Sequence, residues 1–193
     1  MSRDIALGPD VMSGIGLAAA TAVLGALETC GLRGAELKWP NDILYEGRKL
    51  AGLLIELHGE HHGRSLLVIG IGINISMTED AAHHIDQPWI DLSSILGHMP
   101  ARNRLAANII HELTLMVDTF TRNGLAPFRE RWAAYDLTKD RPVRVESPWR
   151  PLSGIARGID DHGALLVETE DGIQHVLSGD VHLRQDQLET LND

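Results

Sequence analysis

Leu66-Leu67-Val68-Ile69-Gly70-Ile71-Gly72-Ile73-Asn74-Ile75 is the stretch of the sequence that decides the fold. Successive side chains of a β-strand point to opposite faces, so this strand has two unlike faces. The aliphatic face holds Leu67, Ile69, Ile71, Ile73 and Ile75, and the other face holds Gly70, Gly72 and Asn74. Glycine weakens a strand and marks places where another group approaches the backbone. The bare face therefore either receives a flat ligand or makes room for a packed helix.

Upstream of this strand we expect one helix and three more strands. The helix covers residues 10–30, is rich in Ala and Leu, and is closed by Gly31. The three strands are expected at 35–39, 43–45 and 50–57, and the glycine strand at 66–75 follows them. Tight turns join them into an antiparallel meander with the helix on one face, and the polar residues 58–65 predict a loop.

Downstream the pattern turns helical. Residues 78–88 are polar and without periodicity, which predicts a mobile loop that becomes ordered with ligand, and Asp91 can cap a short helix. A helix is expected over 103–123, and a second one runs from Pro127 to Tyr135. The apolar face of the longer helix holds Leu105, Ile109, Ile110, Leu113, Met116, Val117 and Phe120.

From Thr138 onward the sequence changes to short strands separated by glycine turns. Five such strands in under sixty residues predict a small β-barrel. We therefore expect two domains, an α+β domain over residues 1–137 and a β domain over residues 138–193.

Composition narrows the class of protein. The 193 residues include 17 basic and 27 acidic side chains, and the resulting charge of −10 argues against a nucleic-acid partner. Cys30 is the only cysteine, which favours a reducing compartment. The most apolar segment, 11–27, is too short and too rich in small residues to span a membrane, so we expect a cytoplasmic protein.

Two further motifs lie before the glycine strand. Lys38-Trp39-Pro40-Asn41-Asp42 reads as a turn, and Arg48 to Glu56 spells R-K-L-A-G-L-L-I-E. A lysine that opens an apolar strand can meet an anion at the end of the sheet. Regular alternation puts Lys49 and Gly52 on opposite faces, so both can contact one ligand only if Lys49 lies in the turn or at a bulge.

The motifs K-W-P-N-D, R-K-L-A-G-L-L-I-E and V-I-G-I-G-I-N-I, in this order, closely resemble the catalytic domain of biotin protein ligases, the biotin–[acetyl-CoA-carboxylase] ligases. The resemblance covers nearly the whole chain. It implies an α+β core related to class II synthetases, with an antiparallel or mixed sheet packed with helices. It also implies that the C-terminal strands form an SH3-like β-barrel.

The resemblance also implies roles for single residues. Lys49 matches the lysine that contacts the biotin carboxylate and the adenylate, and Asp42 matches an aspartate proposed as the base for the acceptor lysine. The floor of the biotin site matches Gly52, Leu54, Gly70 and Gly72. The nucleotide contacts match Asn41, Ile73, Asn74 and Trp89, whose ring would stack on adenine.

The implied reaction has two steps. Biotin and ATP, with Mg²⁺ on the phosphates, give biotinyl-5′-AMP, and a lysine of a biotin carboxyl carrier protein of acetyl-CoA carboxylase then takes the biotin. A homodimer is possible. No protein-bound metal is expected, since His58, His61 and His62 read as a solvated loop rather than a metal site.

The sequence departs from the family pattern at its start. Family members have a strand and a G-R-G-R-x-G loop before the first helix, and repressor-type members also have a DNA-binding domain, whereas we expect this sequence to begin after all three. We therefore expect the 193-residue chain alone to be a poor ligase. Two alternatives stay open: a non-catalytic remnant that binds biotin, nucleotide or a carrier protein, and a related lipoate ligase, which the K-W-P-N-D and R-K-L-A-G motifs disfavour.

Overall fold

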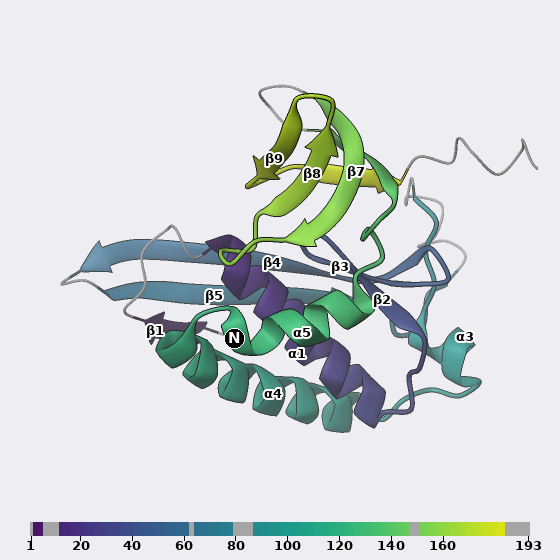
Figure 1. Ribbon diagram of the computed structural model, residues 1–193. Coiled ribbons are helices and arrows are strands. Elements are labelled where there is room, and N and C mark those ends of the chain that lie inside the picture. Colours follow the sequence, from purple (N-terminus) through teal and green to yellow (C-terminus); the bar gives the residue numbers. More distant parts are fainter. Residues whose placement is uncertain (1, 6–11, 62–63, 79–86, 147–150, 184–193) are drawn as a thin grey trace, which may run out of the picture.

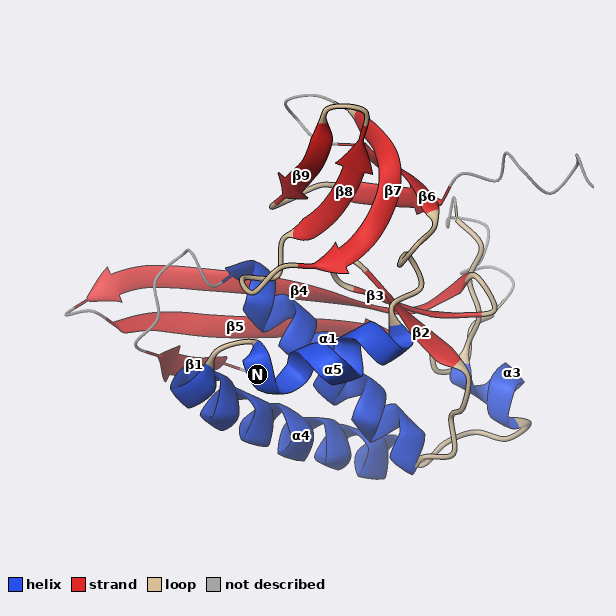
Figure 2. Ribbon diagram, viewed as in Figure 1, coloured by secondary structure: helices blue, strands red, loops and turns tan. Residues whose placement is uncertain are grey.

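The structure is a computed structural model that describes residues 2–5, 12–61, 64–78, 87–146 and 151–183. It is an α+β fold with two antiparallel sheets (Figures 1 and 2). The fold class expected from the sequence is confirmed.

The first sheet has five strands in the order β1-β5-β4-β3-β2. They are β1 (Ser2–Ile5), β2 (Ala35–Lys38), β3 (Asp42–Tyr45), β4 (Arg48–His61) and β5 (Arg64–Ile73). All four neighbouring pairs are antiparallel, so the predicted meander from β2 to β5 is confirmed.

Two features of this sheet differ from the expectation. The prediction of a loop over 58–65 is wrong, because β4 continues to His61 and β5 already begins at Arg64. Backbone pairing extends the hairpin there without an apolar pattern, with Glu60 opposite Ser65. Strand β1 was not expected, and it pairs with residues 65–68 of β5.

Four helices are described. They are α1 (Met12–Thr29), α3 (Leu92–Leu96), α4 (Arg102–Asn123) and α5 (Ala126–Tyr135), close to their expected positions. Helix α1 ends in a turn where Gly31 has a φ of 99°, a conformation that favours glycine. No described helix is both long enough and apolar enough to cross a membrane.

Helices α1 and α4 pack on the aliphatic face of the first sheet. A Cβ on Gly16 of α1 would lie 3.6 Å from Ile55, which pairs with Ile69 of β5. The assignment of Ile110 to the apolar face of α4 is wrong, since its side chain is exposed while Ile109 is buried.

The second sheet has the order β10-β6-β7-β8-β9. Its strands are β6 (Pro142–Glu146), β7 (Leu152–Ile159), β8 (Leu165–Thr169), β9 (Gly172–Val176) and β10 (Asp180–Leu183). All five expected strands are present, and the pairing among the described residues does not join β9 to β10 into a closed barrel. Figure 1 shows this sheet above the first one, with α4 and α5 on the lower side of the molecule.

Candidate functional site

Strand β4 contains one extra residue near its start. Leu44 of β3 pairs with Lys49, and Ile43 pairs with Ala51, so the buried Leu50 has no partner on β3. Such a bulge re-aims the flanking side chains. The bulge therefore meets the condition for Lys49 and Gly52 to share one face of the sheet.

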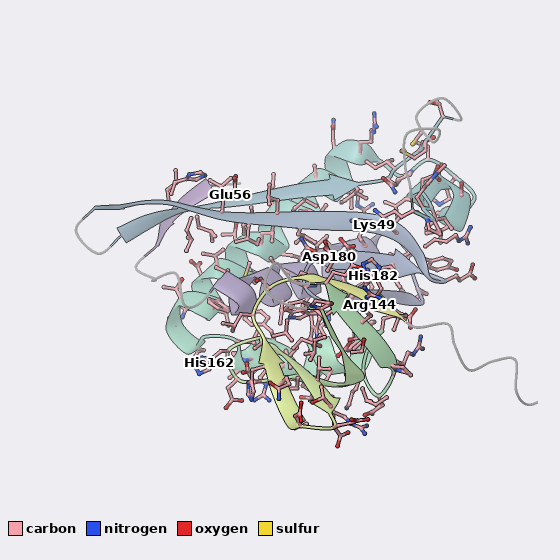
Figure 3. All side chains as sticks on the ribbon, turned by 90° about the horizontal axis from the view of Figure 1, so that it is seen from above. Lys49, Glu56, Arg144, His162, Asp180 and His182 are labelled. Carbon is pink, nitrogen blue, oxygen red and sulfur yellow. The ribbon has the colours of Figure 1, made fainter. Side chains whose placement is uncertain are left out.

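Lys49 and Asp42 form an ion pair on this face. Lys49 Nζ lies 2.8 Å from Asp42 Oδ1, with the two side chains 30% and 14% exposed. A Cβ on Gly52 would lie 3.2 Å from both Asp42 Oδ1 and Lys49 Cε. Because Gly52 has no side chain, Lys49 and Asp42 can approach each other above it. Figure 3 shows Lys49 near the start of β4 and Glu56 farther along the strand.

The glycine face of the hairpin is open. Gly52 pairs with Gly72, and Leu54, which is 60% exposed, pairs with Gly70. A Cβ on Gly72 would meet no other described atom within 4 Å. Since α1 and α4 pack on the opposite face, the interpretation that these glycines make room for a helix is wrong.

A cavity of about 360 Å³ lies over this part of the sheet. The residues that line it are Lys49, Ala51, Gly52, Gly72, Ile73, Asn74, Gln87 and Trp89. The cavity thus combines a backbone floor, one ammonium group and the half-buried ring of Trp89.

Backbone hydrogen bonds attach the segment around Trp89 to the start of β4. Lys49 N donates to Pro88 O (2.9 Å), and Ile90 N donates to Lys49 O (3.0 Å). The same segment is anchored by Asp91, which caps α3 by accepting from Ser94 N (2.8 Å) and also accepts from Met77 N (2.8 Å). Burial raises the pKa of Asp91, but these hydrogen bonds outweigh it and hold the pKa below its usual range.

The two asparagines of the motifs fix the backbone around the cavity. Asn74 Nδ2 donates to Lys49 O (3.1 Å) and to Ile90 O (3.2 Å), so it links the start of β4 to the segment after Trp89. Asn41 Nδ2 donates to Leu53 O (2.7 Å), and Asn41 O accepts from Leu53 N (2.9 Å). Both side chains hold the framework of the site.

The structure brings most of the predicted site residues together. Those that line the cavity or pair with a lining residue are Lys49, Asp42, Gly52, Gly72, Ile73, Asn74 and Trp89. Leu54 and Gly70 lie one step along the same face, and Asn41 lies in the turn before Asp42. Sequence reasoning missed Gln87, because it lies in a stretch without any periodicity.

The expected ordering of residues 78–88 by a ligand concerns mostly residues 79–86, which lie outside the described residues. Within the described part of the chain, no group of three or more His, Cys, Asp or Glu side chains stands close enough to hold a metal ion.

Two family models match the chain. The Biotin/lipoate A/B protein ligase family matches residues 3–74, and the Biotin protein ligase C terminal domain matches residues 139–184. The second match supports the SH3-like assignment of the C-terminal strands.

Known proteins are similar over most of the chain. The bifunctional ligase/repressor BirA of Salmonella typhimurium is 37% identical over 177 residues, 92% of this chain and 55% of that protein. The biotin–[acetyl-CoA-carboxylase] ligase of Mycobacterium tuberculosis is 36% identical over 150 residues, 77% of this chain and 53% of that protein. The chain thus spans about half the length of the curated relatives it matches.

Solved structures agree in fold. The apo structure of biotin protein ligase from Aquifex aeolicus has a TM-score of 0.79 and 25% identity, over 95% of this chain and 80% of that chain. The motifs, the matched family models and these relatives lead to one conclusion: the chain belongs to the biotin protein ligase family.

Proposed function

We propose that this chain forms biotinyl-5′-AMP from biotin and ATP and transfers the biotin to a lysine of a biotin carboxyl carrier protein. The observation that carries the proposal is the open backbone at Gly72, directly beside the Lys49–Asp42 pair. A flat, uncharged ring system fits a floor without side chains. Its carboxylate can then reach the ammonium group at the end of the floor.

In the first step a carboxylate oxygen of biotin attacks the α-phosphorus of ATP, and pyrophosphate leaves. Two anions must approach each other, and Lys49 supplies positive charge where they meet. Asp42 holds the ammonium in place before any substrate arrives, 2.8 Å away. Mg²⁺ bound to ATP would screen the remaining phosphate charge.

In the second step the amine of the carrier lysine attacks the acyl carbon of the adenylate. The carbon–nitrogen bond forms, the carbon–oxygen bond to AMP breaks, and the amine loses a proton. We assign that proton to Asp42, the carboxylate beside the cavity, held in its turn by the contacts between Asn41 and Leu53. Trp89 and Asn74 would receive the adenine and ribose side of the adenylate.

Gly72→Val tests the proposed floor. Valine suits a strand, and its side chain would enter open space in the ligand-free protein, so the fold should survive. The same side chain would occupy the volume of biotin, and we expect the affinity for biotin to fall by about 10- to 100-fold. Calorimetric titration with biotin and thermal denaturation measure the two effects.

Ile71→Val is the matched control, because position 71 points to the opposite, helix-covered face and the change adds nothing to the cavity. Unchanged biotin affinity in Gly72→Val would contradict the proposed floor. Titration with lipoate separates the related lipoate ligase from the biotin enzyme. Adenylate formation should be measured on the 193-residue chain and on a version extended by any coding sequence before Met1.

The remaining assignments are proposals of the same kind. We expect the carrier domain to belong to acetyl-CoA carboxylase. We also expect the protein to act in the cytoplasm and to bind no nucleic acid. The homodimer stays a prediction. We also propose the division into a catalytic region, 1–137, and a C-terminal SH3-like region, 138–193.

A further inference from the structure

The turn that carries Asn41 and Asp42 lies at the edge of the first sheet. Strand β2, which leads into the turn, has β3 as its only neighbour in the sheet order, and its outer edge forms one isolated bridge to Asp136, with Leu137 N donating to Leu37 O (2.9 Å). Within the first sheet Asp42 pairs with Lys38 and Gly52, and Asn41 bonds to Leu53, whereas the strand pairing of the described residues stops short of Trp39. A contact from outside the first sheet adds to these bonds.

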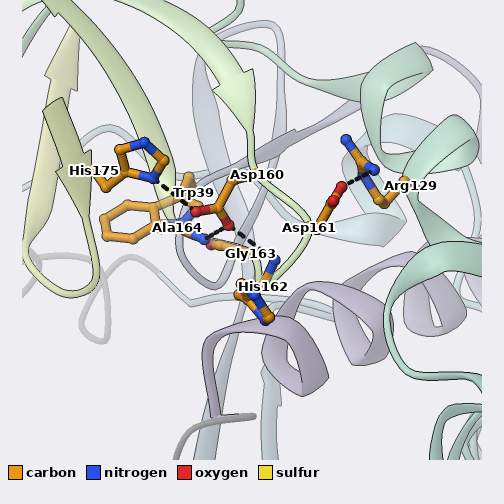
Figure 4. A network of polar contacts seen from close by, with 8 residues as sticks. All are labelled: Trp39, Arg129, Asp160, Asp161, His162, Gly163, Ala164 and His175. Atoms are coloured by element: carbon orange, nitrogen blue, oxygen red, sulfur yellow. Dashed lines mark hydrogen bonds and ion pairs between the residues drawn. The ribbon is translucent and has the colours of Figure 1, made fainter. Parts of the chain in front are cut away.

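A tryptophan in this turn reaches the second sheet. Trp39 is only 1% exposed, and its Nε1 donates to Gly163 O (3.0 Å), a residue 124 positions away. The bond joins the K-W-P-N-D turn to the turn between β7 and β8. Figure 4 shows Trp39 and Gly163 next to each other, within the polar network of that turn.

The turn around Gly163 is itself rigidly built. Asp160 Oδ1 accepts from His162 N (2.9 Å) and Ala164 N (2.9 Å), and Asp160 Oδ2 lies 2.8 Å from His175 Nδ1. Asp160 N also donates to Ala164 O (2.9 Å). One carboxylate thus fixes the turn from three sides.

The same turn rests directly on the backbone of α1. A Cβ on Gly163 would lie 2.9 Å from both N and Cα of Gly14, and Gly163 has a φ of 89°. Only glycine allows this approach. Beside it, Arg129 of α5 forms an ion pair with Asp161. The Gly163 carbonyl is therefore held in place relative to the helices and the first sheet.

From this geometry we propose that Trp39 is a positioning residue, through which the β7–β8 turn of the second sheet holds Asn41 and Asp42 in place. The inference rests on the function proposed above, in which Asp42 takes the proton of the carrier lysine. Trp39 is not among the described residues that line the cavity, so its role concerns the transfer step and not the binding of biotin.

Trp39→Phe removes the indole N–H and keeps a buried aromatic ring. We expect the transfer of biotin from preformed biotinyl-5′-AMP to a carrier domain to slow by about three- to tenfold, the range set by one hydrogen bond. The affinity for biotin should change by less than about twofold. Amide hydrogen exchange of residues 38–45 should become faster in the ligand-free protein.

Trp132→Phe is the matched control. Trp132 is fully buried, and within the described part of the chain its Nε1 has no hydrogen-bond partner. The control loses the same indole N–H group and the same ring volume from a buried site, without loss of a hydrogen bond. We expect its transfer rate and its exchange at residues 38–45 to match the parent protein.

Equal transfer rates in the two variants would overturn the proposal, as would a loss of biotin affinity in proportion to the loss of transfer. If Trp39→Phe fails to fold, Asp160→Ala replaces it, since this change loosens the turn without touching the buried ring. If neither the 193-residue chain nor the extended version forms adenylate, the proposed function fails, whereas the exchange experiment still decides the positioning role. Unchanged exchange at residues 38–45 then overturns it.

Discussion

At the scale of single residues, Lys49 has two separate sets of contacts. Its backbone bonds to Pro88, Ile90 and Asn74 and so joins three segments around the cavity. Its side chain bonds to Asp42 alone among the described residues. A substitution at this position therefore removes the charge and leaves the backbone framework in place.

In a version of the protein with the upstream G-R-G-R-x-G loop restored, Lys49→Ala should lower the rate of adenylate formation by about 10²–10³-fold, because a positioned charge on the reacting phosphate is lost. The free energy of unfolding should fall by no more than about 1–2 kcal/mol, since the side chain makes one ion pair at a partly exposed site. Pyrophosphate release and urea denaturation measure the two quantities.

Arg48→Ala is the control for this change. Arg48 is the preceding residue of β4, and its charge pairs with Glu46 (2.8 Å) outside the cavity. The control should release pyrophosphate at the parental rate. An equal loss in both variants would mean that the overall charge matters and not the position of Lys49.

At the scale of elements, α4 gives a stability prediction from two neighbouring residues. Ile109 is 9% exposed and Ile110 is 57% exposed. Ile109→Ala should lower the free energy of unfolding by about 2–4 kcal/mol, since it leaves a cavity in the core. Ile110→Ala should cost less than about 1 kcal/mol. Urea denaturation decides, and similar losses would contradict the placement of α4.

The hydrophobic periodicity of the sequence predicted most, but not all, of the helices and strands. The apolar pattern predicted β2 to β5, the main helices and the two faces of β5, because each depends on local spacing. It failed for Ile110, since neighbouring helix residues point about 100° apart and both isoleucines cannot face the core alike. It also missed β1, whose Arg3 and Asp4 carry no strand pattern in the sequence and which pairs with residues 65–68 of β5.

The candidate site follows the same rule. Sequence could state that Lys49 and Gly52 share a ligand only with a bulge, but the bulge at Leu50 is set by pairing with β3. Gln87 and the bond from Trp39 to Gly163 have no local signal at all. Contacts between distant segments depend on the completed fold.

At the scale of the whole molecule, Asp160 links stability to pH. Burial raises its pKa, but the bonds from His175 and from the N–H groups of Ala164 and His162 outweigh this and hold the pKa below its usual value. The unfolded chain therefore binds this proton first as pH falls from about 4. The carboxylate stabilises the fold above that pH, and the contribution is lost as pH falls through the folded pKa.

Asp160→Asn should accordingly lower the midpoint of thermal unfolding most at pH 5–7 and least near pH 2–3. Asp161→Asn, which removes the exposed pair with Arg129, should have a small effect throughout. Thermal scans across this pH range test the difference. A constant gap between the parent protein and Asp160→Asn would mean that the carboxylate charge does not matter.

Strand β5 has one face in the groove against α4 and the other face in the floor of the cavity. Its isoleucines line the groove against α4, and on the other face Gly72 lines the cavity, with Gly70 one step farther along. Because the two sets alternate with a period of two, the loss of one residue from β5 would exchange them completely. Isoleucine side chains would then occupy the cavity, and the core beside α4 would lose the side chains that pack there. Single substitutions in β5 change one face only, whereas a deletion changes both faces at once.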